Sequence, residues 1–307
     1  MEWGESLFII MKTENRMIRY NLLLAVSIFC LIDAAGSSVH AAEAAKGLSS
    51  LQGTTGVEGA APSSVPASTP SSNMNKELHN PLSNLKEFIF QLDVLPDAGP
   101  YEKTAYDFSA QPVYPFSLPN DWKLVTYSII PVLSQPQVAA DGSRTEGLGD
   151  TRFYGYFVPP KEEGLIWGFG PAAQLPTHTD SDLGNDKWAA GPALIVGAQP
   201  GNWSIWGLFD NIWSFAGSGE DINEFSFQYQ VVYLLPKDWF LISNWVIDAD
   251  WEVSSEDRWT VPIGGGFGRQ FKFAGSQFQL YGQAGYNVEA PDEASSWRGI
   301  MALTYVF

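Results

Sequence analysis

The chain has 307 residues and a formal net charge of −17, from 17 basic and 34 acidic side chains. This acidity argues against binding to nucleic acid and against docking on an anionic surface. The 12 Trp, 19 Phe and 12 Tyr residues are more large apolar rings than a disordered chain carries. We therefore expect a folded protein that has a place for many aromatic side chains.

The first 41 residues have the composition of a signal peptide. Three basic residues precede a short apolar run at 22–32, and small residues then lead to Ala41, which fits a signal-peptidase site. The run is too short to cross a bilayer as a helix, which needs about 20 residues. Its Cys30 is the single cysteine of the sequence, so a processed chain has no disulfide or thiol nucleophile. Processing leaves 14 basic and 30 acidic residues, a formal charge of −16.

Residues 42–80 form a second region with a different composition. They are rich in Ser, Gly, Pro and Ala and show no hydrophobic periodicity. Such a stretch has too little apolar surface to fold alone. We interpret it as a disordered linker in front of a folded domain at 81–307.

Apolar and polar side chains alternate along the folded domain. In 225–235 the odd positions are mostly aromatic or aliphatic, whereas Ser226, Gln228 and Gln230 fall on the other face. The last stretch, 297–307, alternates in the same way and ends in an aromatic residue. This period of two predicts β-strands with one apolar and one polar face. Five prolines fall within the expected strands, where they predict bulges or strand ends: Pro112, Pro131, Pro171, Pro192 and Pro262.

Tryptophans recur directly after the turn sequences. Three turns of the type Pro-x-Asn/Asp, at 119–121, 200–202 and 236–238, are each followed by Trp, and a looser version precedes Trp167. These residue types favour tight turns. The expected periplasmic-rim aromatics are Trp122, Trp167, Trp203, Trp239 and Phe307. A second set falls at the opposite strand ends: Trp188, Trp213, Trp251, Trp259 and Trp297. Two aromatic girdles are typical of barrels that cross an outer membrane.

The connections between the strands are alternately short and long. The longer ones are acidic and fall at 137–147, 178–187, 216–224, 252–258 and 289–296. Outer-membrane barrels show this asymmetry, with short periplasmic turns and longer outer loops. The sequence therefore predicts an outer-membrane barrel of a Gram-negative type of bacterium, with a periplasmic linker at 42–80.

The number of strands follows from the direction in which each strand must run between the two ends of the barrel. Eleven strands lie between 103 and 307, and the last must run toward the periplasm. An upward strand at 86–94 should therefore precede them. We predict an all-β fold, a transmembrane antiparallel β-barrel of about twelve strands whose closure leaves no exposed edge. A soluble β-sandwich would explain the strands but neither the two girdles nor the terminal aromatic residue.

Several short motifs resemble one family. They are NPLS at 80–83, QPVYPFSL at 111–118, GLGD at 147–150, LIWGFGP at 165–171, QLPT at 174–177, KW and GP within 187–192, WSFAG at 213–217 and WTVPI at 259–263. Together they resemble the outer-membrane barrels linked with the meta-cleavage pathway of phenol degradation, often labelled neuromedin-U-like or transporter. The resemblance covers about residues 80–307 and implies a barrel concerned with the passage of organic compounds. It implies no catalytic residues.

Catalytic and metal-binding chemistry has little support in the sequence. His178 lies beside Thr177 and Thr179, so a hydrolase that uses this histidine is one alternative. A solvated loop histidine is the simpler interpretation. Asp180, Asp182 and Asp186 alternate in an acidic loop and are weak candidates for a calcium site, but the closing glutamate of a calcium loop is missing. We expect no enzyme activity and no cofactor.

The polar faces of the strands are the expected functional surface, because they would line the lumen. The candidate lumen-facing residues are Lys103, Asp107, Gln111, Arg152, Tyr154, Lys187, Asp210, Gln228, Gln230, Asn244, Asp248, Asp250, Gln270, Lys272, Gln283, Asn287 and Arg298. Five are basic and four acidic, which indicates no strong ion preference. Twelve strands lie between small barrels filled by side chains and large open pores. A closed, ion-paired interior is the alternative to a narrow path.

Three functions fit these features. The leading hypothesis is a passive transporter or channel, porin-like in character, for small organic compounds, aromatic ones included. A structural or adhesive barrel that acts through its acidic loops is the second, and the hydrolase is the third. The expected partners are outer-membrane lipid, lipopolysaccharide and small organic solutes.

Overall fold

The computed structural model describes residues 70–136, 143–160 and 164–307. The expected signal peptide, 1–41, and the linker up to residue 69 lie outside the described residues and stay predictions. These described residues belong to one compact unit. Among the described residues, no helix is both long and apolar enough to cross a membrane.

The described chain consists almost entirely of strands. They are β1 (Glu87–Ala98), β2 (Lys103–Ser117), β3 (Lys123–Pro136), β4 (Arg144–Leu148), β5 (Thr151–Val158), β6 (Ile166–Leu175), β7 (Lys187–Ala198), β8 (Trp203–Gly217), β9 (Asn223–Leu234), β10 (Trp239–Asp250), β11 (Trp259–Phe273), β12 (Ser276–Glu289) and β13 (Trp297–Val306). One α-helix, α2 (Pro70–Glu77), precedes them. Three single turns, η2 (Pro119–Asp121), η3 (Ser181–Leu183) and η4 (Pro236–Asp238), connect strands.

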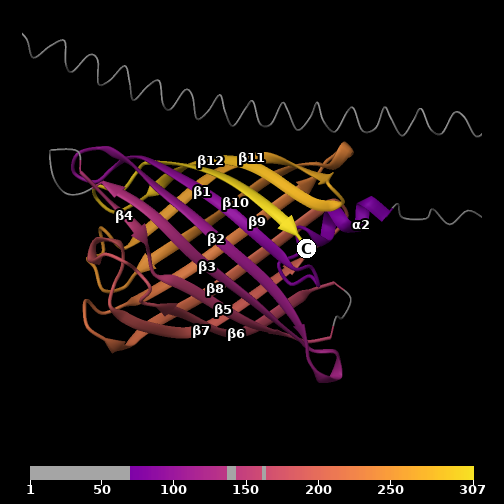
Figure 1. Cartoon of the computed structure of the whole chain (residues 1–307), viewed down its shortest axis with the longest axis horizontal. Coiled ribbons are helices and arrows are strands. Elements are labelled where there is room, and N and C mark those ends of the chain that lie inside the picture. Colours follow the sequence, from indigo (N-terminus) through magenta and orange to yellow (C-terminus); the bar gives the residue numbers. More distant parts are fainter. Residues whose placement is uncertain (1–69, 137–142, 161–163) are drawn as a thin grey trace, which may run out of the picture. The chain divides into compact units, whose positions relative to one another are not determined.

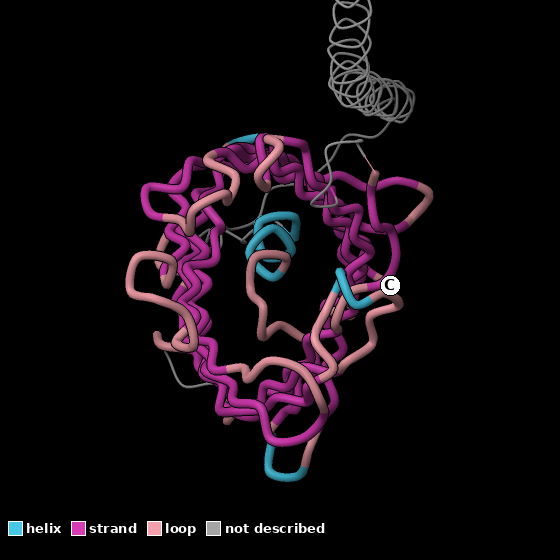
Figure 2. The backbone as a smooth tube through the Cα atoms, turned by 90° about the vertical axis from the view of Figure 1, so that its left-hand side faces the viewer, coloured by secondary structure: helices cyan, strands magenta, loops and turns pink. Residues whose placement is uncertain are grey.

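The strands form one closed antiparallel sheet. Apart from β4 and β5, which do not pair with each other, strands that are adjacent in the chain pair, and β1 pairs with β13, which closes the ring (Figures 1 and 2). β3 pairs with β4 at one end and with β5 at the other. These two strands are therefore halves of a single strand interrupted at Gly149 and Asp150. The thirteen strands make a twelve-stranded barrel, which confirms the predicted fold. β4 also shortens the loop expected at 137–147, because the sheet resumes at Arg144.

The first strand is confirmed as well. β1 pairs with β13 from Glu87 opposite Val306 to Val94 opposite Gly299. The N–H of Phe307 donates to the carbonyl of Lys86 at 3.1 Å, one step beyond this ladder. The C-terminal strand therefore closes the barrel, as its direction predicted.

The outer wall of the barrel is apolar. Along β10 and β11, Leu241 is 49% exposed, and Ile263 and Phe267 are 57% and 54% exposed. Their neighbours in β10, Phe240 and Ile242, point inward and are at most 4% exposed. This contrast follows the alternation of a strand with two different faces. The five prolines all lie within strands, and Pro262 lies at a register shift between β11 and β12.

The two ends of the barrel differ in their connections. At one end, η2 and η4 turn the chain with two successive residues at positive φ, between 59° and 64°. This backbone geometry is that of the type I′ turn, which matches the twist of paired strands. The C-terminus lies at the same end, because β13 runs toward it (Figure 1). We call this the short-turn end, and the other the loop end.

The prediction of a disordered linker is wrong for residues 70–80. Pro70–Glu77 form α2, and residues 78–80 are buried. Viewed along the barrel, this segment projects within the ring of strands (Figure 2), and Figure 1 shows α2 at the end of the barrel where the C-terminus lies. A stretch without apolar periodicity is ordered here because the barrel wall surrounds it. Its burial depends on the barrel rather than on a core of its own.

Candidate functional site

The lumen near the short-turn end is filled by residues 74–83, which we call the plug. Leu78, His79, Asn80, Leu82 and Ser83 are each at most 7% exposed. The side chain of Asn80 accepts a hydrogen bond from the N–H of Leu82 at 3.0 Å, which turns the chain sharply inside the barrel. The plug begins in the last turn of α2, and residues 78–83 then enter the lumen without regular secondary structure.

Barrel side chains hold the plug by its backbone. The hydroxyl of Ser204 and the amide of Gln230 both donate to the carbonyl of His79, at 2.8 and 3.2 Å. Lys123 donates to the carbonyl of Leu82 at 2.6 Å. Buried carbonyls need such donors, because an unpaired one costs about 1–3 kcal/mol. The wall of the lumen therefore provides polar groups that match the backbone of this segment.

His79 is the buried titratable group of the plug. Its Nε2 lies 3.0 Å from the amide nitrogen of Gln270, and its ring packs edge-on against Phe240 with 4.5 Å between centroids. Because an amide nitrogen can only donate, Nε2 must accept, and the ring is neutral. Burial lowers the pKa of His79 to about 3. The docked plug therefore excludes a protonated His79.

Leu82 joins the plug to the middle of the lumen. It is 1% exposed and belongs to one apolar cluster with Val125, Tyr154, Tyr156 and Trp206 of the barrel wall. Its burial contributes about 1.5–3 kcal/mol to docking. Displacement of the plug would therefore uncover an aromatic surface inside the barrel.

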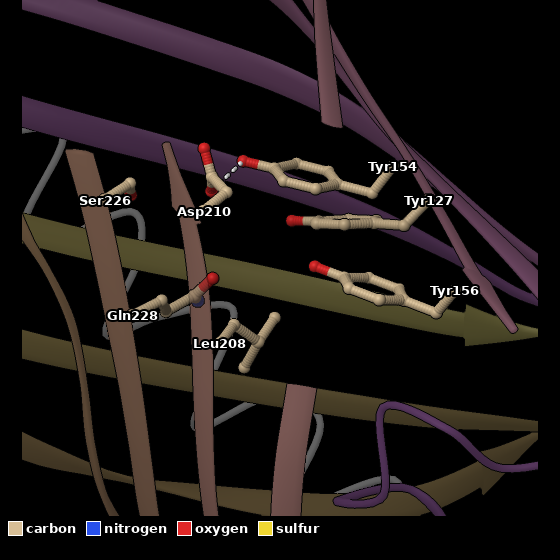
Figure 3. Close-up of a pocket in the computed structure, with 7 residues that line it drawn as sticks. All are labelled: Tyr127, Tyr154, Tyr156, Leu208, Asp210, Ser226 and Gln228. Carbon is tan, nitrogen blue, oxygen red and sulfur yellow. Dashed lines mark hydrogen bonds between the residues drawn. The ribbon is translucent and has the colours of Figure 1, made fainter. Parts of the chain in front are cut away.

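A small cavity lies beside this cluster. Three tyrosines from β3 and β5 stack in parallel, with centroids 5.6 Å apart for Tyr127 and Tyr154 and 5.9 Å for Tyr154 and Tyr156. Their hydroxyl groups point toward Asp210 and Gln228 on the opposite strands (Figure 3). The Tyr154 hydroxyl donates to Asp210 Oδ1 at 3.2 Å. The cavity is thus lined by hydroxyls, one carboxylate and one amide.

Charged residues form a belt around the lumen on the loop side of the plug. Asp93 and Asp107 are register partners on β1 and β2, and Arg298 of β13 forms a salt bridge with Asp93. On the other side, Arg152 pairs with Glu224 at 3.2 Å. Asp210 and Asp248 flank Ser226 in one cross-strand row. We call these seven charged residues the charged belt: Asp93, Asp107, Arg152, Asp210, Glu224, Asp248 and Arg298.

Other predicted lumen residues form hydrogen bonds between strands, in one case across an intervening strand. Gln228 donates to Asn244 Oδ1 at 2.9 Å, and Gln283 Oε1 accepts from the backbone N–H of Asn244 at 3.1 Å. Gln111 accepts from the Tyr127 hydroxyl at 2.7 Å. Gln230 and Gln270 contact the plug instead, as described above.

A few predicted lumen residues lie at strand ends. Lys187 pairs with the exposed Asp221 at 2.8 Å, and Asp250 caps the N–H of Glu252 in an outer loop. Lys103 lies over the ring of Tyr101 at the loop end. Asn287 bonds the carbonyl of Ser295 in the β12–β13 connection at 2.7 Å, and Lys272 is exposed near the short-turn end. None of these five joins the charged belt.

Some residues of the site are not among the lumen residues predicted from the sequence. Asp93 and Glu224 lie on the polar faces of β1 and β9, so the alternation already contained the signal for both. Tyr127 and Tyr156 were not singled out, because an aromatic residue on a polar face does not stand out in a sequence. His79 lies in the expected linker, where nothing in the sequence indicates that its side chain is buried.

His178 lies in a cluster of carboxylates at the loop end. Its Nδ1 is 2.7 Å from Asp150 Oδ1, and its Nε2 is 3.2 Å from Asp186 Oδ1. The hydrogen bond to Asp150 raises the pKa of His178 above its ordinary value. The hydroxyl of Thr177 is engaged elsewhere, since it donates to the carbonyl of Gly149 at 2.9 Å. The arrangement stabilises a loop and lacks the hydroxyl–imidazole pair of a hydrolase.

The three aspartates of the weak metal candidate point to different partners. Asp180 accepts the N–H of Asp182 and caps η3. Asp182 accepts the hydroxyl of Thr145 at 3.0 Å, and Asp186 faces His178. Among the described residues, no group of three or more His, Cys, Asp or Glu side chains is arranged to hold a metal ion.

The expected rim aromatics all lie at the short-turn end, at the start of β3, β6, β8 and β10 and at the end of β13. Trp203 is 44% exposed and packs against Tyr233, with 4.7 Å between centroids. Trp239 packs against Phe267, and the guanidinium of Arg269 lies over it at 5.5 Å. These rings form part of the outer wall of the barrel.

Comparison with known proteins points to one class of fold. No protein-family model matches the chain, and no curated protein matches it in sequence. The structure resembles an outer-membrane channel of Pseudomonas putida F1, with 16% identity and a TM-score of 0.55 over 73% of this chain and 94% of the channel. The likeness is one of fold. The NanC porin (10% identity, TM-score 0.45, 72% of this chain and 98% of that one) and the toluene transporter TodX of Pseudomonas putida (9%, 0.38, 75% and 92%) are more distant.

Proposed function

We propose that this chain is a passive outer-membrane channel for small organic solutes and that the plug closes it. The observation that carries the proposal is the lumen itself, which is polar, charged and occupied by the chain's own N-terminal segment. A barrel with only a structural role has no need of a lumen wall that binds a separate segment by its carbonyls. The plug closes the inner half, while the charged belt lines the half toward the loops.

The outer wall supports a membrane location. Most strands have 10–15 residues, which is enough to cross the hydrocarbon core when tilted. Exposed aromatic and aliphatic side chains cover this wall, and a closed barrel leaves no unpaired strand edge for lipid to meet. The short-turn end, with the expected rim aromatics, would face the periplasm. The acidic loops would face lipopolysaccharide on the cell surface.

The substrate class is proposed from two observations. The resemblance of residues 80–307 to barrels linked with phenol degradation favours organic compounds, aromatic ones included. The stacked tyrosines in the lumen supply an apolar and hydrogen-bonding surface of the kind that such compounds contact. We propose small organic molecules as cargo on this basis.

Uptake by proteoliposomes tests this function. Purified protein is reconstituted, and entry of a panel of small neutral, cationic and anionic organic solutes is measured against vesicles with heat-unfolded protein. Entry of at least one class should be faster with the folded protein and should proceed only down its gradient. Equal rates for the whole panel with both the full-length protein and a variant that lacks residues 70–83, together with no ion conductance by either, would rule out a channel.

A further inference from the structure

Asp210 is a buried carboxylate with half of its hydrogen-bonding capacity unused. It is 7% exposed, and its Oδ1 accepts the hydroxyl of Tyr154. Its Oδ2 is buried and accepts no hydrogen bond. Arg152 lies 4.0 Å from Oδ2 but directs its guanidinium to Glu224, at 3.2 Å. A buried carboxylate oxygen without a hydrogen-bond donor costs free energy, so a ligand that donates a hydrogen bond to Oδ2 would be stabilised here.

The surroundings of Oδ2 are those of a site for a small group with several donors. Asp210 lines the cavity with Ser226, Gln228 and the three tyrosine hydroxyls (Figure 3). The Gln228 amide nitrogen is used by Asn244, which leaves its carbonyl oxygen as an acceptor toward the cavity. The space holds about one water-sized group. A ring does not fit in it, but an ammonium group does.

The charge of the lumen favours a cation at this position. The charged belt has five carboxylates and two guanidinium groups, a formal excess of three negative charges. The lumen residues predicted from the sequence included nearly equal numbers of basic and acidic side chains. Three of the basic ones, Lys103, Lys187 and Lys272, lie at strand ends outside the belt. An anion would meet this excess in a medium of low polarity, where like charges repel strongly.

We propose that the cavity at Asp210 binds the ammonium group of a small organic amine and that the lumen favours cations over anions. This rests on the proposed channel function and names a solute class for it. The N–H groups of an ammonium can donate to Asp210 Oδ2, to the Ser226 hydroxyl and to the Gln228 carbonyl. The organic part of the amine would lie against the tyrosine stack and would replace Leu82 of the docked plug there. A quaternary ammonium has no N–H to donate and is too large for the cavity.

Equilibrium dialysis of radiolabelled methylammonium against the full-length protein in detergent micelles at pH 7.5 tests the site directly. The wild type should bind about one equivalent saturably, and tetramethylammonium should not displace it. Asp210→Asn should weaken binding about tenfold or more, the usual effect of losing a charge-assisted hydrogen bond. The matched control is Asp221→Asn, which changes an exposed loop carboxylate and should bind like the wild type.

Folding of each variant is checked by the heat-dependent shift of a closed barrel on a gel. If Asp210→Asn does not fold, Ser226→Ala and Gln228→Met remove neutral acceptors and should each weaken binding several-fold. No saturable binding to the wild type, equal binding by these variants, or displacement by tetramethylammonium would overturn the site.

Reversal potentials in a KCl gradient separate this inference from the channel proposal. Cation preference that falls in Asp210→Asn supports both. Methylammonium binding without any conductance, in the full-length protein and in a variant that lacks residues 70–83 alike, would contradict the channel and leave the site standing. Conductance that prefers anions, or that occurs without methylammonium binding, would contradict the site and leave the channel standing.

Discussion

Arg298 holds the seam at which the barrel closes. Its guanidinium bridges from β13 to Asp93 on β1, with Nε 3.1 Å from Oδ2. Asp93 is 2% exposed, so Arg298 is the counter-charge of a buried carboxylate. The position of Arg298 on the polar face was predictable from alternation. Its partner was not, because the pairing requires the two ends of the chain to meet.

Loss of this arginine should destabilise the barrel. Arg298→Met leaves the Asp93 carboxylate buried without a counter-charge and should lower the free energy of unfolding by about 3 kcal/mol. Tryptophan fluorescence during guanidinium unfolding in lipid vesicles measures the change. The double variant with Asp93→Asn should regain more than half of the loss. Lys272→Met, at an exposed position near the short-turn end, is the control, and an equal loss there would contradict this role.

His79 should make the plug sensitive to acid. In the docked plug its pKa is about 3, whereas a released plug has the ordinary value near 6.5. Above pH 6.5 the ring is neutral in both states and docking is fully stable. As the pH falls from 6.5 toward 3, only the released plug takes up the proton. The docked-to-released ratio should therefore fall by up to about tenfold per pH unit.

Planar-bilayer conductance between pH 7.5 and 4.5 measures this release. Wild-type conductance should rise as the pH falls below 6.5. His79→Gln retains a hydrogen-bonding side chain that does not titrate and should show a nearly flat profile. A rise of the same size in His79→Gln would assign the effect to other groups and contradict the prediction.

At the scale of elements, β7 and β8 approach each other closely at Gly191. A Cβ added there would lie 1.8 Å from the carbonyl oxygen of Asn211, an impossible contact with backbone. The β7–β8 ladder skips from Ala190 to Ala193 around this glycine. Only a residue without a side chain allows these strands to come together here.

Gly191→Ala should therefore force the two strands apart. We expect a loss of about 2 kcal/mol or more in stability, with a lower yield of folded barrel in refolding assays. Gly299→Ala is the matched control, because a Cβ there meets nothing within 4 Å. Its refolding should match the wild type. Equal yields for the two variants would show that the wall relaxes around Gly191.

The strands were predictable because each has a face toward lipid and a face toward the lumen. The alternation in 225–235 corresponds to β9, and strand direction together with the alternation in 86–94 predicted β1. The plug could not be predicted, since its composition is that of a linker and its burial depends on the barrel wall. The candidate site was predictable in part. Polar faces indicated Asp210 and Arg152, but their neighbours across the lumen depend on how the sheet closes.

The whole molecule combines a rigid wall with a separable plug. The wall is one continuous ladder that closes on itself, so local changes within it cost stability. The plug is held in the wall by a few hydrogen bonds, two buried leucines and one neutral histidine. Its removal should therefore leave the barrel folded. The central claim is that this segment closes a path through the barrel.

Single-channel conductance of a variant that lacks residues 70–83 tests this claim most directly. Its control lacks residues 50–63, an equal length of the expected linker. Both variants should show the heat-dependent gel shift of a folded barrel. The account predicts that conductance rises several-fold on loss of 70–83 and stays at the full-length level on loss of 50–63. A folded 70–83 deletion with conductance no higher than the full-length protein would contradict it.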